Sequence, residues 1–212
     1  MGNERLVGNI GSVCAMGLSS AGKSALARLL VGRFRGCGFA CALIDGDEVR
    51  NLFDEGYGYD PESRRAQSRR LLKLARWIEH EQIIPVVAMI HPFEDDRLLF
   101  RERLHNYYQI YLECDVEECT RRDSRDRKGV YSLAERTDTP QVVGLDIPFE
   151  PVHSADIVLN SKDRSTEELV EVLWEDLQKS FFPKARKDAA LSPEMEVLCA
   201  KYSVAFGRRM AR

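Results

Sequence analysis

The sequence predicts an α/β fold of three layers, in which helices cover both faces of a mainly parallel sheet. Five short apolar runs alternate with longer segments that repeat their apolar residues at helical spacing. Strands that alternate with helices along a chain are typical of a parallel sheet, because each helix carries the chain back to start the next strand. A glycine-rich stretch stands between the first run and the first helical segment, where α/β folds often bind phosphates.

The five predicted strands are short and mostly continuous in their hydrophobicity, as expected for strands that are buried on both faces. They cover residues 12–16, 40–45, 83–90, 108–114 and 156–160. Pro85 lies near the start of the third run and has no amide hydrogen to donate. We therefore expect the start of that run, including Pro85, to lie outside the sheet.

Three long helices are predicted between or after these strands, over residues 22–35, 61–81 and 165–180. The second has Asp60 as a candidate N-cap and Pro61 at its first position. The third opens on Ser-Thr-Glu-Glu, which is a capping-box pattern. Six basic residues also make the second helix unusually positive, and some of them are expected to bind an anionic substrate: Arg64, Arg65, Arg69, Arg70, Lys73 and Arg76.

Two segments depart from the alternation of strands and helices. Residues 123–150 are charged and broken by Gly and Pro, which predicts a long lid over a site. Residues 183–212 follow the predicted domain 1–182 and are expected to form a helical extension, with apolar residues on one side at Met195, Leu198, Cys199, Tyr202 and Phe206. That apolar side must be buried on its own domain or on a second copy, and we expect a homodimer.

Composition excludes several classes of protein. The 212 residues are 44% hydrophobic with a net charge of −3, so no basic field indicates binding to nucleic acid or to a membrane. No signal peptide or membrane-spanning run is found. The six cysteines form no C-x-x-C pair, and no His/Cys pair has the spacing of a zinc site. These features are typical of a reduced, cytoplasmic protein.

The stretch GLSSAGKS, from Gly17 to Ser24, has the phosphate-binding pattern G-x-x-x-x-G-K-[ST]. It follows a predicted strand and opens a predicted helix, where backbone N–H groups and the helix N-terminus can face phosphates. Lys23 is expected to reach the outer phosphates and the Ser24 hydroxyl to bind Mg²⁺. The pattern predicts a P-loop fold that binds a nucleoside triphosphate with Mg²⁺, the nucleotide being held by Gly17, Leu18, Ser19, Ser20, Ala21, Gly22, Lys23 and Ser24. P-loops serve kinases, switches and motors alike, so the reaction must be inferred from other residues.

Asp45 and Asp47 stand at the end of the second predicted strand, in the stretch IDGDEVR. The carboxyl ends of strands line the crevice where open α/β sheets bind ligands. Asp45 is expected to bind Mg²⁺ or to take the proton from an attacking hydroxyl, with Asp47 beside it. The predicted catalytic residues are thus Lys23, Asp45 and Asp47. A guanine-nucleotide switch is disfavoured, because no N-K-x-D pattern follows a predicted strand.

Six stretches occur in the order and rough spacing typical of the adenylylsulfate (APS) kinase family, which the chain resembles over residues 12–180. They are GLSSAGKS (17–24), IDGDEVR (44–50), GYDPESRRAQSRR (58–70), IHPF (90–93), RDRKGVY (125–131) and GLDIPFEP (144–151). Members of the family transfer the γ-phosphoryl group of ATP to the 3′-hydroxyl of adenylyl sulfate. The resemblance implies an ATP-dependent kinase of sulfate assimilation whose substrate is a small nucleotide.

The resemblance also implies roles for residues outside the phosphate loop. The segment between Cys119 and Lys128 is longer than the family pattern by three residues, so either Arg122 or Arg125 matches the lid arginine near the bound ATP. The residues that the resemblance assigns to the acceptor are Arg50, Tyr59, Arg64, Gln67, Arg69, Ile90, His91, Lys128 and Leu145.

Departures from the family pattern fall mostly on the acceptor side. Glu48 replaces an Asn, Glu94 replaces an Arg, and Val142 replaces the Phe that stacks on the acceptor base. The main alternative is therefore a divergent kinase that acts on another nucleotide-linked or small hydroxyl acceptor, such as a cytidine diphosphoramidate in surface-polysaccharide synthesis. A nucleotide-binding regulator without turnover is a further alternative.

Overall fold

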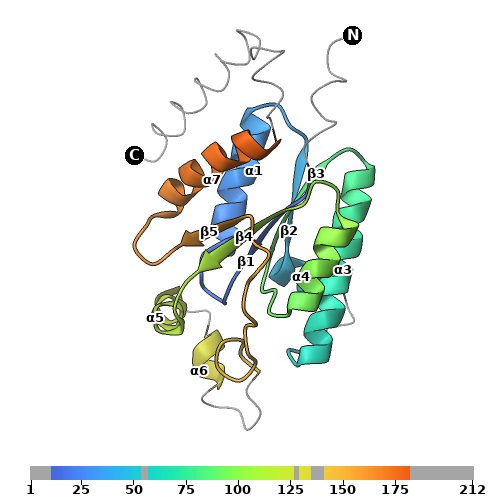
Figure 1. Ribbon diagram of the computed structural model, residues 1–212. Helices are drawn as coiled ribbons and strands as arrows, with labels where there is room; N and C mark the ends of the chain where they lie inside the picture. Colours follow the sequence, from blue (N-terminus) through green and yellow to red (C-terminus); the bar gives the residue numbers. More distant parts are fainter. Residues whose placement is uncertain (1–10, 54–56, 127–128, 135–140, 182–212) are drawn as a thin grey trace, which may run out of the picture.

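The computed structural model describes residues 11–53, 57–126, 129–134 and 141–181 (Figure 1). It contains a five-stranded sheet of order β2-β3-β1-β4-β5, in which every pairing is parallel. The strands are β1 (Val13–Met16), β2 (Cys41–Asp45), β3 (Ile84–Met89), β4 (Tyr108–Glu113) and β5 (Ile157–Asn160). Each strand lies inside its predicted range, and the predicted α/β fold is confirmed.

The helices of the described residues are α1 (Lys23–Gly36), α2 (Gly46–Leu52), α3 (Pro61–His80), α4 (Glu94–Arg103), α5 (Val116–Asp126), α6 (Val130–Ala134) and α7 (Thr166–Phe181). Helices α1 and α7 cover one face of the sheet, while α3 and α4 cover the other (Figure 1). Both predicted caps are present. The Asp60 carboxylate accepts the Ser63 N–H at 2.9 Å, and Ser165 and Glu168 cap each other's backbone N–H groups.

Alternate residues of the central strands divide the core between the two faces. Val13 and Ala15 of β1 belong to the cluster beneath α1 and α7, whereas Cys14 belongs to the cluster beneath α3 and α4. All five cysteines in the described ranges are buried free thiols, and burial raises the pKa of Cys14 to about 12. They therefore act as small apolar groups.

The expectation that Pro85 lies outside the sheet is wrong, because both Ile84 and Pro85 pair with β2. The Ile84 N–H donates to the Ala40 carbonyl at 2.9 Å, so alternation along the strand directs the Pro85 nitrogen to the other side, toward β1. β1 pairs with β3 only from Val86 onward. The missing N–H thus costs the ladder no hydrogen bond.

The interpretation of residues 123–150 as one irregular lid needs correction, because α5 continues to Asp126 and α6 follows at Val130. Helices α2, α4 and α5 were also not predicted. Their inward faces carry polar groups, including the buried Arg97 on α4 and Asp123 on α5, which hide the helical period of apolar residues.

Residues 183–212 and Lys128 lie outside the described residues, so the helical extension and the homodimer stay predictions. Among the helices that are described, none combines the length and the hydrophobicity needed to cross a membrane.

Candidate active site

The phosphate loop joins β1 to α1 at the carboxyl edge of the sheet, and its backbone suits an anion. Gly17 (φ 151°) lies so close to β4 that a Cβ would be 2.5 Å from the Leu112 carbonyl oxygen. Gly22 (φ 101°) is the N-cap of α1. It has no side chain that could accept a hydrogen bond from the N–H groups of the first turn, so no N-cap side chain occupies these groups. The loop is a cradle that side chains at these two positions would disturb.

Lys23 lies inside this loop. Its side chain is only 9% exposed, and its ammonium group donates to the Leu18 carbonyl oxygen at 2.6 Å. The positive charge is thus at the centre of the loop, where the outer phosphates of a nucleotide would bind. Ser20 has left-handed backbone geometry (φ 59°), which is uncommon outside glycine and frequent at ligand sites.

Asp45 is buried at the end of β2, whereas Asp47 is exposed on the first turn of α2. The Oδ1 atom of Asp45 accepts the Asp47 N–H at 3.0 Å, so the capping of α2 orients this carboxylate. Its Oδ2 atom lies 3.8 Å from Arg28 of α1, which donates to Glu48 at 2.7 Å. Together with the half-buried Ser24, Asp45 offers the oxygen ligands that Mg²⁺ prefers.

Three residues that the resemblance assigns to acceptor binding lie close together. They are Arg50 on α2, Tyr59 in the segment before α3, and Arg64 in the first turns of α3. The guanidinium groups of Arg50 and Arg64 lie 4.7 Å and 5.6 Å from the centre of the Tyr59 ring. Burial, and then the charge of Arg50, lower the pKa of Arg64 to about 10. Two like charges held this close favour the binding of an anion, and the 55% exposed Tyr59 ring provides a flat apolar surface beside them.

A turn at residues 142–147 connects this cluster to the phosphate loop. Arg64 donates to the carbonyl of the preceding Gln141 at 2.7 Å. Gly144 (φ 97°) lies so close to Leu18 that a Cβ would be 3.0 Å from its side chain. Val142 is buried, and the exposed Leu145 lies on the same turn. The acceptor residues and the phosphate loop are therefore parts of one surface.

Two further candidates lie beneath this surface. Gln67 is buried and donates to the Gly46 carbonyl at 3.1 Å, which ties α3 to the start of α2. The imidazole of His91 is fully buried and lies 3.1 Å from the Ser68 hydroxyl. Burial, and then Arg97, lower the pKa of His91 to about 3, so it is neutral near pH 7. The His91 ring is thus enclosed by protein, with Ser68 and Phe100 as neighbours.

The remaining acceptor candidates are spread out. Ile90 is half-buried at the carboxyl end of β3, at the edge where the phosphate loop lies. Arg69 lies five residues after Arg64 on α3, which turns it by about 140° around the helix. It is exposed and lines a groove outside the cluster of Arg50, Tyr59 and Arg64.

Asp123 is a site residue that the sequence analysis missed. It is buried on α5, accepts the Ser20 hydroxyl at 3.3 Å, and accepts the Tyr131 N–H at 3.2 Å. The Tyr131 hydroxyl donates to the Ser19 carbonyl, also at 3.2 Å. The start of the lid is therefore fastened to the phosphate loop. An acidic residue four positions after Cys119, on the inward side of a helix, was the available signal.

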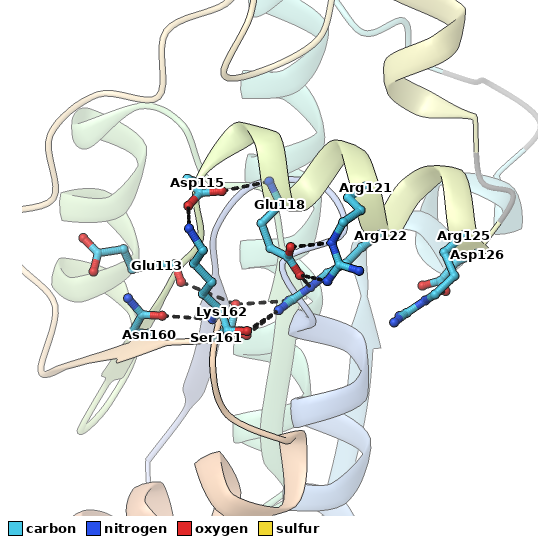
Figure 2. A network of polar contacts seen from close by, with 10 residues as sticks. All are labelled: Glu113, Asp115, Glu118, Arg121, Arg122, Arg125, Asp126, Asn160, Ser161 and Lys162. Carbon is cyan, nitrogen blue, oxygen red and sulfur yellow. Dashed lines mark hydrogen bonds and ion pairs between the residues drawn. The ribbon is translucent and has the colours of Figure 1, made fainter.

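The two candidate lid arginines differ in their surroundings (Figure 2). Arg122 contacts Glu118 and reaches across to Ser161 and Lys162, which follow β5. Arg125 contacts its neighbour Asp126, and its side chain is 65% exposed. Arg122 thus braces α5 against the loop after β5, while the guanidinium group of Arg125 faces solvent.

Arg97 is fully buried and holds together the segment beside the acceptor surface. It donates to the Glu94 carboxylate at 2.6 Å, to the His91 carbonyl at 2.8 Å and to the Pro151 carbonyl at 2.7 Å. The Glu150 carboxylate also accepts the Glu94 N–H at 2.5 Å. Because Arg97 compensates the charge of Glu94, the Glu that stands here in place of the family's Arg is not an unpaired carboxylate.

We expect Arg97→Met to destabilise the protein by about 3–5 kcal/mol, because the Glu94 carboxylate and buried carbonyl groups would lose their donor. Urea unfolding followed by circular dichroism measures the change. Arg103→Met is the matched control, because the ion pair of Arg103 with Glu102 is exposed and contributes less than about 1 kcal/mol. A similar loss in both variants would contradict the role given to Arg97.

Comparison with known proteins gives one family. The sequence model of the family described as adenylylsulphate kinase matches residues 11–160. The adenylyl-sulfate kinase of Bacillus licheniformis is 30% identical over 154 residues, which cover 72% of this chain and 77% of that protein. The adenylyl-sulfate kinase of Vibrio cholerae is 33% identical over 156 residues, which cover 73% of this chain and 71% of that protein.

Solved structures agree with these sequence matches. The Mycobacterium tuberculosis APS kinase CysC, in complex with AMPPNP and APS, matches with a TM-score of 0.73 and 25% identity, over 80% of this chain and 98% of that chain. A gluconokinase from Sinorhizobium meliloti shares the fold, with a TM-score of 0.57 and 16% identity. The family match spans the phosphate loop, Asp45 and the cluster of Arg50, Tyr59 and Arg64.

Proposed function

The chain belongs to the adenylylsulphate kinase family, and we propose that it transfers the γ-phosphoryl group of ATP to the 3′-hydroxyl of adenylyl sulfate. The observation that carries the proposal is that Arg50 and Arg64 converge on Tyr59, beside a phosphate loop. Two cations and a flat ring suit an anionic nucleotide, and the turn 142–147 links them to the loop.

The residues present fit ATP and Mg²⁺. The glycine cradle leaves room for phosphates, while Ser24 and Asp45 supply oxygen ligands. In the part of the chain that the structure describes, no group of three or more His, Cys, Asp or Glu side chains could hold a metal ion, so phosphate oxygens and water molecules would supply the other ligands. Bound Mg²⁺ neutralises charge on the phosphates during transfer.

The protein's own residues would then align and stabilise the reacting groups. Lys23 and the amides of the loop would stabilise charge on the transferred phosphoryl group. Asp45 would orient the acceptor hydroxyl and take its proton, and Asp47 would lie next to it. Arg125, which faces solvent, is the better placed of the two lid arginines to close over the phosphates, while Arg122 would order the loop after β5.

A second candidate function is the phosphorylation of another nucleotide-linked or small hydroxyl acceptor. It is supported by Val142, which is buried where the family has an aromatic ring that stacks on the acceptor base. A regulator without turnover is less well supported, because Lys23, Ser24 and Asp45 are all present in suitable surroundings.

If the second candidate function is correct, the wild-type protein should use adenylyl sulfate weakly, and Val142→Phe should raise kcat/KM for it about fivefold. An aromatic pair contributes roughly 1 kcal/mol beyond the free energy of burying its apolar area. A difference of about 1.4 kcal/mol corresponds to a tenfold change in affinity. Rates of ADP release with Mg-ATP and a panel of acceptors measure the effect, and mass spectrometry identifies each phosphorylated product. The panel includes adenylyl sulfate and cytidine diphosphoramidate.

Val142→Leu is the matched control, since it adds bulk without a ring, and thermal unfolding checks that neither variant strains the buried turn. An equal gain with leucine would mean that stacking is not the cause. If the wild-type protein already turns over adenylyl sulfate at micromolar concentrations, the shift to another acceptor fails and the usual activity of the family stands.

A further inference from the structure

The outward side of α3 carries a groove that the proposed reaction does not use. It has a volume of about 530 Å³, and its eight lining residues are Phe53, Tyr57, Ala66, Arg69, Arg70, Lys73, Leu74 and Trp77. Of these eight described residues, three are cationic, three are aromatic and none is acidic, while Asp54 and Glu55 stand between Phe53 and Tyr57 in the sequence and lie outside the described residues. This composition contrasts with the net charge of −3 for the whole chain.

One wall of the groove is organised around Arg70. Its guanidinium group lies 4.4 Å from the centre of the Phe53 ring and 4.1 Å from that of the Tyr57 ring. Stacking of this kind fixes the plane of a guanidinium group, and Arg70 also donates to the Gln67 Oε1 atom at 3.4 Å. Tyr57 also borders the acceptor cluster, because its carbonyl accepts from Arg50 at 2.5 Å.

The other wall is a single ridge of α3. Arg69, Lys73 and Trp77 follow one another at intervals of four residues, so they lie in a row of about 12 Å along the helix. Arg69 and Lys73 are exposed, and the Trp77 indole is 63% exposed. An exposed indole in line with two cations can stack on a flat base while the cations bind phosphates.

We infer that this groove is a second binding site, for a nucleotide whose base stacks on Trp77 and whose phosphates contact Lys73 and Arg69. An inorganic anion would leave the aromatic side chains unused. The segment from residue 183 onward is a poor occupant, because its seven Lys and Arg residues exceed its three acidic ones. The inference does not depend on the proposed kinase reaction.

Trp77 itself supplies the measurement. The chain has two tryptophans, and Trp174 is buried against Phe34, so a ligand in the groove should quench mainly the exposed Trp77. We would titrate the Lys23→Ala variant with ADP and follow tryptophan fluorescence, and the double variant Lys23→Ala/Trp77→Phe reports any signal that arises from ADP in the phosphate loop. The expected result is saturable quenching that is absent in Lys23→Ala/Trp77→Phe. Adenosine alone and inorganic phosphate alone should each bind at least tenfold more weakly than ADP.

Two charge reversals complete the test. Lys73→Glu should raise the dissociation constant for ADP at least tenfold, whereas Arg76→Glu should leave it within about twofold, because Arg76 is exposed on the same helix but outside the groove. Three results would overturn the inference: no quenching in the Lys23→Ala background, inorganic phosphate binding as tightly as ADP, or a signal that follows self-association in sedimentation. None of these results bears on kinase activity.

Discussion

Replacing Lys23 with alanine is expected to lower the rate of phosphoryl transfer about 10³-fold. The ammonium group lies inside the loop, 2.6 Å from the Leu18 carbonyl oxygen, and is oriented before a substrate arrives. Removal of one pre-oriented group that stabilises transition-state charge typically costs 10²–10³ in rate. The glycine cradle and the amides of α1 remain, so the affinity for ATP should fall much less than the rate.

The measurement is kcat at saturating Mg-ATP with the best acceptor of the panel, together with nucleotide affinity by equilibrium dialysis. Lys179→Ala is the matched control, because Lys179 is an exposed lysine in the last turn of α7. Circular dichroism checks that both variants fold. Turnover at the wild-type rate in Lys23→Ala would refute the role of this lysine.

The strands could be predicted because their signal is local. Val86 and Val87 are adjacent and face opposite layers, so burial on both faces requires a continuous apolar run that is visible in the sequence. The same argument fails for α4 and α5. Their inward faces include Arg97 and Asp123, whose hydrogen-bond partners include residues far away in sequence, so the apolar periodicity is interrupted at these positions.

The candidate site likewise has one part that the sequence could predict and one part that it could not. The phosphate loop and Asp45 depend on a few consecutive residues, and the structure places them where the pattern requires. For residues on α3, the direction in which each side chain points depends on tertiary packing. Arg64 faces Tyr59, Gln67 is buried beneath the site, and Arg69 lies in the outer groove, although one motif contains all three. Spacing along a helix sets their relative directions, but only packing decides which direction faces the site.

Asp45→Asn is expected to slow the chemical step by about 10²–10⁴-fold while ATP binding is retained. The asparagine oxygen can still accept the Asp47 N–H, so the cap of α2 and the local backbone should be preserved. The amide cannot take a proton from the acceptor hydroxyl, and it is a weaker ligand for Mg²⁺ than a carboxylate. Single-turnover rates and nucleotide affinity, measured on the same preparation, separate chemistry from binding.

Asp47→Asn is the matched comparison and should cost less than about tenfold. Asp47 is exposed, and its charge is one of several that act on Arg64 of the acceptor cluster, so its loss should change KM for the acceptor more than it changes kcat. Titration with Mg²⁺ then distinguishes the two roles proposed for Asp45, which are binding of the metal and acceptance of the proton. If high Mg²⁺ restores the rate of Asp45→Asn, the carboxylate acts through the metal, and if it does not, the carboxylate acts on the proton. If Asp47→Asn is the more damaging variant, the roles of the two carboxylates must be exchanged.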